Sequence, residues 1–173
     1  MNVLNAVVCS VLILAAFATP VCAQTGFVNM VDHIHLAAPD QAKGAEWYRA
    51  HFGAEPTPEG PDRMMLGTTR LIFQKTEAPK PSEESVLNVI GFSVADLDAT
   101  MKKLQADGVK VVMPAMTMQG MKMGQVVDPW GMLIDVVQDP QKLGLHHVYL
   151  RGPNPTASLA WFADMFEIGR AHV

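Results

Sequence analysis

Cysteine is nearly absent from this chain. The only two cysteines, Cys9 and Cys22, lie in the apolar N-terminal segment, so the remainder of the sequence offers neither disulfides nor thiolate chemistry. Runs of like charge are also missing. Charged residues make up 17% of the chain and the net charge is −4, so there is no basic patch of the kind that binds nucleic acid. We therefore expect no nucleic-acid partner. Hydrophobic residues at 49% are sufficient for a folded core.

Charge is missing altogether from Met1 to Val31. An apolar run from Ala6 to Ala18 is followed by small residues that suit cleavage after Ala23. Residues 1–23 are therefore predicted to be a secretory signal peptide. This predicts an exported bacterial protein, periplasmic or extracellular, with no membrane contact after cleavage. Two alternatives stay open. One is a membrane anchor, although the run is shorter than the roughly 20 residues that a spanning helix needs, and the other is a lipoprotein acylated on Cys22.

One segment of the sequence occurs twice. His33-Ile-His-Leu36 reappears as His147-Val-Tyr-Leu150, and because 147 − 33 and 161 − 47 both equal 114, the same offset superposes Trp47 on Trp161. Such self-similarity indicates duplication of a supersecondary unit. The later copy stops just after its helix. Residues 145–166 are therefore expected to begin a second, truncated domain, as a strand and helix with no sheet of their own.

The last residues, 167–173, follow no pattern set earlier in the chain. Residues 168–173 match what one reading frame of a common sequencing adapter would encode, so we expect the segment 167–173 to be non-native. An ordinary frayed C-terminus is the alternative.

Hydrophobic periodicity predicts the order βαβββ twice between residues 30 and 138. The first unit, residues 30–75, has a strand at 30–38 and a helix that Asp40 caps and Gly53 stops. A linker with two prolines follows at 76–85. The second unit, residues 86–138, has a helix capped by Asp96. Its strands are predicted at 87–94, 109–113, 122–127 and 132–137. The fold class is therefore predicted to be α+β, with a truncated third unit after the pair.

Two features suggest chemistry. His33 and His35 alternate with apolar residues on a predicted strand, so both imidazoles project to the same face. This spacing can bind a metal, but hydrogen-bonded wall residues show it too. Asp135 is a carboxylate within an apolar strand, where a charge must be paired, protonated or metal-bound unless the residue lies at an edge facing water. An imidazole and a carboxylate that converged would suit Zn²⁺, Fe²⁺ or Mn²⁺.

Several motifs together resemble the vicinal oxygen chelate superfamily, which contains glyoxalase I, the bleomycin and fosfomycin resistance proteins, and extradiol dioxygenases. The motifs are His33-Ile-His-Leu-Ala-Ala-Pro-Asp40, the Trp47-Tyr48 helix that ends in Phe52-Gly53, Gly91-Phe-Ser-Val-Ala-Asp-Leu-Asp98, and Asp128-Pro-Trp-Gly131 before Ile134-Asp135. The resemblance covers nearly all of residues 30–167. It implies one domain at 30–138, in which paired βαβββ units form a cup-shaped mixed sheet with helices outside. In this family the cup holds a divalent metal that chelates adjacent oxygens of a substrate.

The resemblance also implies where metal ligands should lie, namely on the first and last strand of each unit. His33 matches the first-strand ligand, and Asp135 stands where the family commonly has Glu. The matching position in the second unit is Val89, and the last strand of the first unit has no carboxylate. Only two of the four ligands are therefore found, unless His35 or Gln74 compensates.

His147 sits at the ligand position of the third unit, with His146 before it. The resemblance implies that His147 would be the first ligand of the missing second domain.

Two functions follow from the resemblance. The first is a divalent-metal-assisted lyase, isomerase or dioxygenase, with Zn, Fe, Mn or Ni, acting on a small molecule with neighbouring oxygens. The alternative is a non-catalytic small-molecule binder, similar to the bleomycin resistance proteins. The sequence leaves open whether the chain is an enzyme, and it is compatible with a homodimer.

Two further groups of residues have alternative interpretations. A cluster of methionines either binds Cu(I) through soft thioethers or forms an adaptable apolar wall, which is the favoured interpretation. Arg63 and Arg70 either hold an anionic substrate or are solvated at the surface. The methionines are Met113, Met116, Met118, Met121 and Met123.

Overall fold

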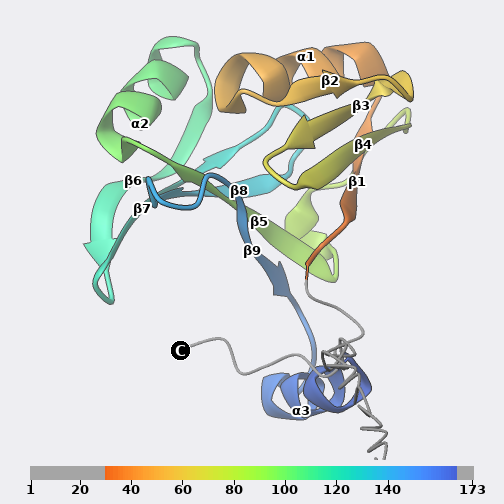
Figure 1. Cartoon of the computed structure of the whole chain (residues 1–173), viewed down its shortest axis with the longest axis vertical. Coiled ribbons are helices and arrows are strands. Elements are labelled where there is room, and N and C mark those ends of the chain that lie inside the picture. The colour runs from red at the N-terminus through yellow and green to blue at the C-terminus, as the bar shows by residue number, and fades with distance from the viewer. Residues whose placement is uncertain (1–29, 167–173) are drawn as a thin grey trace, which may run out of the picture.

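The computed structural model of the chain describes residues 30–166 (Figure 1). The predicted signal peptide at 1–23 and the predicted tail at 167–173 lie outside the described residues. The elements in chain order are β1 (His33–Ala38), α1 (Gln41–Phe52), β2 (Glu55–Thr57), β3 (Gly60–Leu66), β4 (Thr69–Lys75), the 3-10 turn η1 (Ser82–Glu84), β5 (Leu87–Val94), α2 (Leu97–Ala106), β6 (Lys110–Met118), β7 (Met121–Val127), β8 (Leu133–Gln138), β9 (Gly144–Leu150) and α3 (Pro155–Phe166).

The strands form two mixed sheets, with orders β1-β4-β3-β2 and β6-β7-β8-β5-β9. In each βαβββ unit the first strand pairs in parallel with the last, β1 with β4 and β5 with β8, and the other pairs are antiparallel. Helices α1 and α2 lie on the same side of the strands, at the top of Figure 1. The predicted class, α+β with paired βαβββ units, helices outside and a partial third unit, is confirmed.

Local signals in the sequence set the helix ends as predicted. The side chain of Asp40 accepts a hydrogen bond from the backbone N–H of Lys43 at 3.1 Å, and Gly53 closes α1 in the left-handed conformation at φ +70. In α2, Asp96 accepts from the backbone N–H of Ala99 at 3.0 Å. The caps fix the ends of the helices, and the buried apolar face of each helix packs on the sheets.

A buried hydrogen bond joins the two units. The hydroxyl of Tyr48, on α1, donates to Oδ2 of Asp128, in the β7–β8 turn, at 2.9 Å. Oδ1 of Asp128 accepts from the backbone N–H groups of Trp130 and Met132, at 2.9 and 2.8 Å. Burial raises the pKa of Asp128, although the two backbone donors oppose the change. Burial, followed by the neighbouring charge of Asp128, raises the pKa of Tyr48 well above its usual range. Each of these two buried side chains thus has the other as a hydrogen-bond partner in an apolar interior.

Strand β6 is longer than the sequence predicted. The predicted strand ends at residue 113, and the next residue is Pro114, which cannot donate a hydrogen bond to a ladder. In the structure β6 continues to Met118. It is the edge strand of its sheet, and its register with β7 shifts between Val111 and Met113 and again between Met113 and Met116. Edge position and bulges are both conditions under which a strand tolerates proline.

The third unit behaves differently in its two parts. The predicted strand builds no sheet of its own, but it is not left without partners: β9 pairs in antiparallel fashion with β5 of the second unit, and Leu145 and Val148 pack against the core. The helix α3 stands apart from both sheets (Figure 1). None of its residues is buried, and Trp161 is 53% exposed. No helix within residues 30–166 has the length and hydrophobicity to span a membrane.

The link between the units leads to a first prediction. Tyr48→Phe removes the only side-chain donor to Asp128 among the described contacts, and a hydrogen bond to a charged group contributes about 1.5–3 kcal/mol. We expect the free energy of unfolding, measured by urea denaturation, to fall by about that amount. The matched control is Tyr149→Phe, at an exposed tyrosine, which should change it by no more than about 0.5 kcal/mol. Equal effects of the two substitutions would contradict the assignment.

The integration of β9 leads to a second prediction, which separates the strand from the helix that follows. Truncation after Gly152 removes α3 alone, and we expect an unchanged or higher thermal midpoint and less aggregation, because an exposed apolar helix face is a liability. Truncation after Leu143 also removes β9, so the edge of β5 and the core contacts of Leu145 are lost and the midpoint should fall. Differential scanning fluorimetry and light scattering measure both. If the two truncated forms have the same thermal midpoint, β9 contributes nothing to stability.

Candidate functional site

Asp135 lies in the centre of the second sheet. Strand β8 runs between β7 and β5, and Asp135 faces Gln125 on one side and Gly91 on the other. The residue is only 2% exposed, and its Oδ1 accepts a hydrogen bond from Nε2 of Gln125 at 2.7 Å. The alternative that Asp135 sits at an edge facing water is therefore wrong. Its carboxylate is a buried group that needs partners.

His147 is the second partner of Asp135. Its Nε2 lies 3.2 Å from Oδ2 of Asp135, and its side chain is 21% exposed. The imidazole reaches the carboxylate by lying over Gly91. A side chain at this position would block it, since a Cβ on Gly91 would come within 2.3 Å of the ring. Asp135 and His147 are called the His–Asp pair below. The absence of a side chain at Gly91 leaves the space that this pair occupies.

His146 extends this arrangement. Nδ1 of His146 lies 2.8 Å from Nδ1 of His147. If Nε2 of neutral His147 donates to Asp135, its Nδ1 can only accept, so His146 is then the donor in this contact. Burial, and next the proximity of His147, lowers the pKa of His146, which favours the neutral ring. The result is a chain of polar groups from Gln125 through the His–Asp pair to His146.

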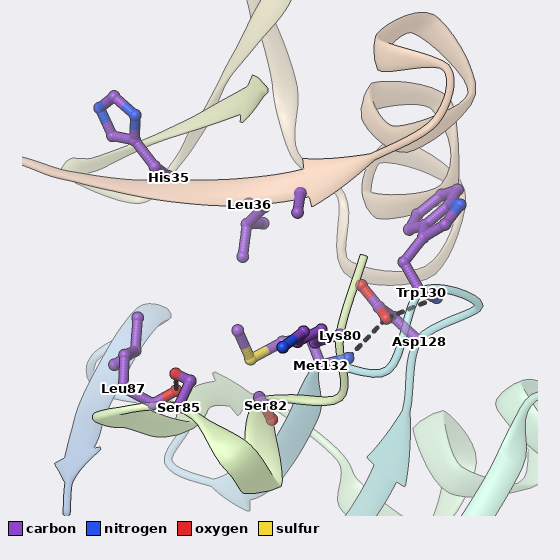
Figure 2. Close-up of a pocket in the computed structure, with 10 residues that line it drawn as sticks. His35, Leu36, Lys80, Ser82, Ser85, Leu87, Asp128, Trp130 and Met132 are labelled. Atoms are coloured by element: carbon purple, nitrogen blue, oxygen red, sulfur yellow. Dashed lines mark hydrogen bonds between the residues drawn. The ribbon is translucent and has the colours of Figure 1, made fainter. Parts of the chain in front are cut away.

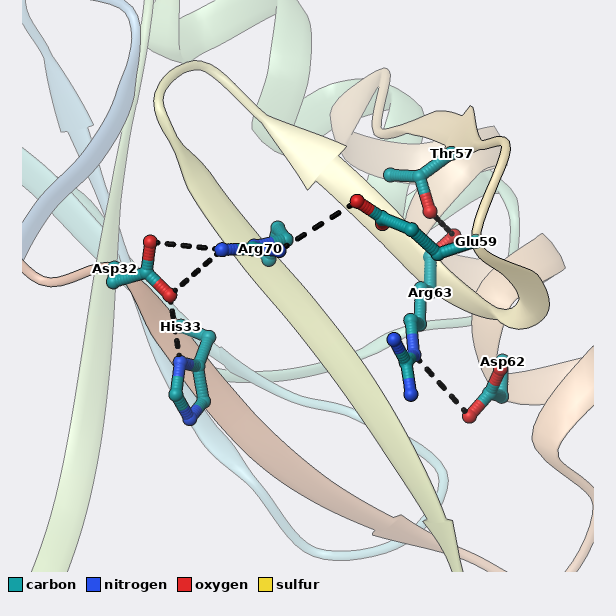
Figure 3. A network of polar contacts seen from close by, with 7 residues as sticks. All are labelled: Asp32, His33, Thr57, Glu59, Asp62, Arg63 and Arg70. Carbon is teal, nitrogen blue, oxygen red and sulfur yellow. Dashed lines mark hydrogen bonds and ion pairs between the residues drawn. The ribbon is translucent and has the colours of Figure 1, made fainter.

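The histidines of β1 lie elsewhere, on the first sheet. The rings of His33 and His35 are 5.1 Å apart, on one face as the spacing predicted. Nδ1 of His33 contacts Oδ2 of Asp32 at 2.8 Å, and Nη2 of Arg70 contacts both oxygens of Asp32 at 3.0 Å (Figure 3). The hydrogen bond from His33, and then the one from Arg70, lowers the pKa of Asp32. His33 is thus held by a neighbouring carboxylate.

The two arginines of this region are also paired. Arg70 has a second carboxylate, that of Glu59, at 3.6 Å, and Arg63 lies 3.8 Å from Asp62 (Figure 3). Their charges are therefore partly compensated within the protein. A bound anion would have to compete with these carboxylates.

A divalent metal does not fit the donor set. Within residues 30–166 no group of three or more His, Cys, Asp or Glu side chains is placed to hold an ion. Of the four predicted ligands, the structure brings Asp135 together with His147, whereas His33 contacts Asp32 and His35. A structural Zn²⁺ site needs four protein ligands and a catalytic one three. The two donors of the His–Asp pair do not complete either.

A separate cleft of about 220 Å³ lies between the units. Leu36 of β1, Leu87 of β5 and Met132 form its apolar part, and Lys80 and Ser85 of the linker lie at its rim (Figure 2). His35 also borders the cleft, but its ring projects from the opposite side of β1 to Leu36 (Figure 2). Neither member of the His–Asp pair lines this cleft. The cleft offers space, whereas the His–Asp pair offers a buried carboxylate in direct contact with a partly exposed imidazole.

The pairing of His147 with Asp135 was not predicted from the sequence. The resemblance implied that His147 would be a ligand of a missing second domain, whereas the structure places it on β9 beside Asp135. The one signal available was Gly91, a residue without a side chain in an otherwise apolar strand, which often marks the close approach of another group.

Comparison with known proteins gives a consistent picture of the fold. The family model of the glyoxalase/bleomycin resistance protein/dioxygenase superfamily matches residues 30–136. No curated protein matches the chain. Among solved structures, a virulence protein from Salmonella typhimurium is 19% identical, with 64% of this chain and 97% of that chain covered and a TM-score of 0.51.

Two further structures agree with this comparison. A member of the same superfamily from Sphaerobacter thermophilus is 18% identical, with 65% and 98% covered and a TM-score of 0.50. An integron cassette protein from V. cholerae is 21% identical, with 64% and 95% covered and a TM-score of 0.51. At these identities the likeness concerns the fold alone. His147 and β9 lie beyond the residues that the family model matches.

The contact of His147 with Gly91 leads to a third prediction. Gly91→Ala should destabilise the protein by about 1–3 kcal/mol, because the new methyl group overlaps the imidazole. In a His147→Ala background the same substitution should be nearly neutral, since the atoms nearest to the new Cβ all belong to His147. A double-mutant cycle based on urea denaturation measures the coupling. Identical costs in the two backgrounds would show that His147 does not lie over Gly91.

Proposed function

Because the chain belongs to the glyoxalase/bleomycin resistance protein/dioxygenase superfamily, we propose that it binds a small molecule with neighbouring oxygens against the His–Asp pair. The observation that carries this proposal is the contact between Asp135, which is buried, and His147, which is partly exposed. Asp135 fixes the ring through Nε2, and a ligand would compete with His146 for Nδ1 of the partly exposed His147. Non-catalytic binding is the function that this geometry supports best.

The pair has the chemistry for recognising oxygen atoms. Because Nε2 of His147 is directed at the buried carboxylate, the ring can present Nδ1 to a ligand hydroxyl as a hydrogen-bond acceptor. Gln125 holds the carboxylate from the other side, so the orientation of the ring does not depend on a single contact. Tyr149 lies beside His147, with ring centroids 4.9 Å apart, and its hydroxyl adds a donor on the same strand. A ligand with two adjacent oxygens could engage both side chains.

Metal-assisted catalysis is the second candidate. It is supported by the same pair, because Asp135 stands at the last-strand ligand position and His147 at the first-strand position of a repeated unit. The donor set within the described residues does not complete a metal site, so further donors would have to come from elsewhere. Export to the periplasm or beyond and assembly as a homodimer remain predictions from the sequence.

The fourth prediction tests binding with catechol, a simple probe with two adjacent oxygens. We expect catechol to shift backbone amide resonances around Gly91, Gln125 and Asp135 in two-dimensional NMR spectra. His147→Ala should abolish these shifts, because it removes the partly exposed ring whose Nδ1 the ligand would meet. His33→Ala is the matched control at the equivalent strand position of the first unit, and it should leave them unchanged. Shifts that are lost with His33→Ala and kept with His147→Ala would place the ligand on the first sheet and refute the proposal.

Calorimetry distinguishes the two candidates. Titration with Zn²⁺, Mn²⁺ and Fe²⁺ should show only weak binding, because two protein ligands leave most of the coordination shell to water. A tight site for a single ion, abolished by His147→Ala or by Asp135→Asn, would favour the metal-dependent enzyme instead. If His33→Ala abolished such a site, the ligand assignment from the sequence would be restored.

A further inference from the structure

Four methionines share one face of the β6–β7 hairpin. Met118 lies directly opposite Met121, and Met116 lies opposite Met123. Side chains alternate along a strand, so these four project to the same face and form two adjacent cross-strand pairs. Thr117 and Lys122, which oppose each other between the pairs, project to the other face. The alternation in the sequence thus becomes a cluster of thioethers in the structure.

The geometry of the hairpin brings these side chains close together. Gln119 and Gly120 form a two-residue turn with φ angles of +50 and +81, as a tight hairpin requires. Directly opposed residues have Cβ atoms about 4.5–5.5 Å apart. Methionine is unbranched and has three rotatable side-chain bonds, so four sulfurs on two adjacent pairs can turn towards one point.

The cluster is open to solvent. The pairing of β7 with β8 extends only to Met123, so the hairpin projects beyond the sheet (Figure 1). Met116 and Met118 are each 44% exposed and Met121 is 36% exposed, whereas Met123 is 7% exposed. An ion can therefore reach three of the sulfurs from outside and find the fourth at the base of the hairpin.

The chemistry of the face selects a particular class of ion. Lys122, on the opposite face, is paired with Asp98, so neither charge is directed at the methionines. Thioethers are soft ligands that favour Cu(I), whereas Mg²⁺, Ca²⁺ and Mn²⁺ prefer oxygen. We propose that the β6–β7 hairpin binds one Cu(I) ion through Met116, Met118, Met121 and Met123. This site is independent of the His–Asp pair, and it makes use of apolar side chains that would otherwise gain little from exposure.

The fifth prediction tests this site in the full chain with Cys9→Ser and Cys22→Ser, because both cysteines are soft ligands in their own right. Under anaerobic conditions with ascorbate, competition with the chromophoric chelator bicinchoninate should show one tightly held Cu(I) per chain. Combined replacement of the four methionines by Leu should abolish this binding. Leu and Met are similar in volume, so the fold should be retained, and circular dichroism checks this. Met165→Leu, at an exposed methionine of α3, is the matched control and should bind as the parent does.

Single substitutions and a second ion locate the site. Loss of an outer-shell partner alone costs roughly 10–100-fold in metal affinity, so Met116→Leu or Met118→Leu should weaken Cu(I) binding at least about tenfold. Ag⁺, a redox-inert soft ion, should shift the methyl resonances of the four hairpin methionines and no others in NMR spectra of methyl-labelled protein. The proposal is overturned if the parent does not compete with bicinchoninate, if the Leu variant still binds, or if Ag⁺ shifts exposed methionines throughout the chain. The last two results would leave the hairpin as an apolar wall only.

Discussion

The hydrogen bond between Tyr48 and Asp128 is the contact on which the rest of the structure depends. It joins the helix of the first unit to the turn that leads into β8 of the second. The same turn holds the linker, because the backbone N–H of Ser82 donates to Gly131 and Oγ of Ser82 accepts from Leu133. A buried carboxylate is costly unless it is satisfied, and here three donors offset that cost. Through this turn the first unit fixes the start of the strand that carries Asp135.

Much of the fold could be predicted because its signals are local. The caps at Asp40 and Asp96 and the stop at Gly53 are written in neighbouring residues, and the structure uses each as expected. Predictions from neighbouring residues failed where the position of a strand within its sheet determines the structure. The predicted strand ended at residue 113, but an edge position with bulges lets β6 continue through Pro114 to Met118. Position within a sheet depends on partners far away in the sequence, which periodicity does not reveal.

The candidate site shows the same division. Asp135 could be identified, because a carboxylate in an apolar strand always needs an explanation, and the shared face of His33 and His35 followed from alternation. Their partners could not be predicted. Asp32 holds His33, and the pairing of β9 with β5 brings His147 to Asp135 across Gly91. The contact of His33 with Asp32 joins neighbours in sequence, yet it occupies a histidine that the family pattern would assign as a metal ligand. The second depends wholly on long-range pairing.

The two-residue turn at Gln119 and Gly120 has a consequence for the order of folding. Strands β6 and β7 are joined directly, so their pairing closes a very short loop, whereas the parallel pairs β1–β4 and β5–β8 must wait for a helix and further strands to be enclosed. An isolated hairpin forms in about 1–10 μs. The β6–β7 ribbon is thus positioned to form early and to serve as a template on which β8 and then β5 assemble. The sheet of the second unit would then form from its edge strand β6 towards β5.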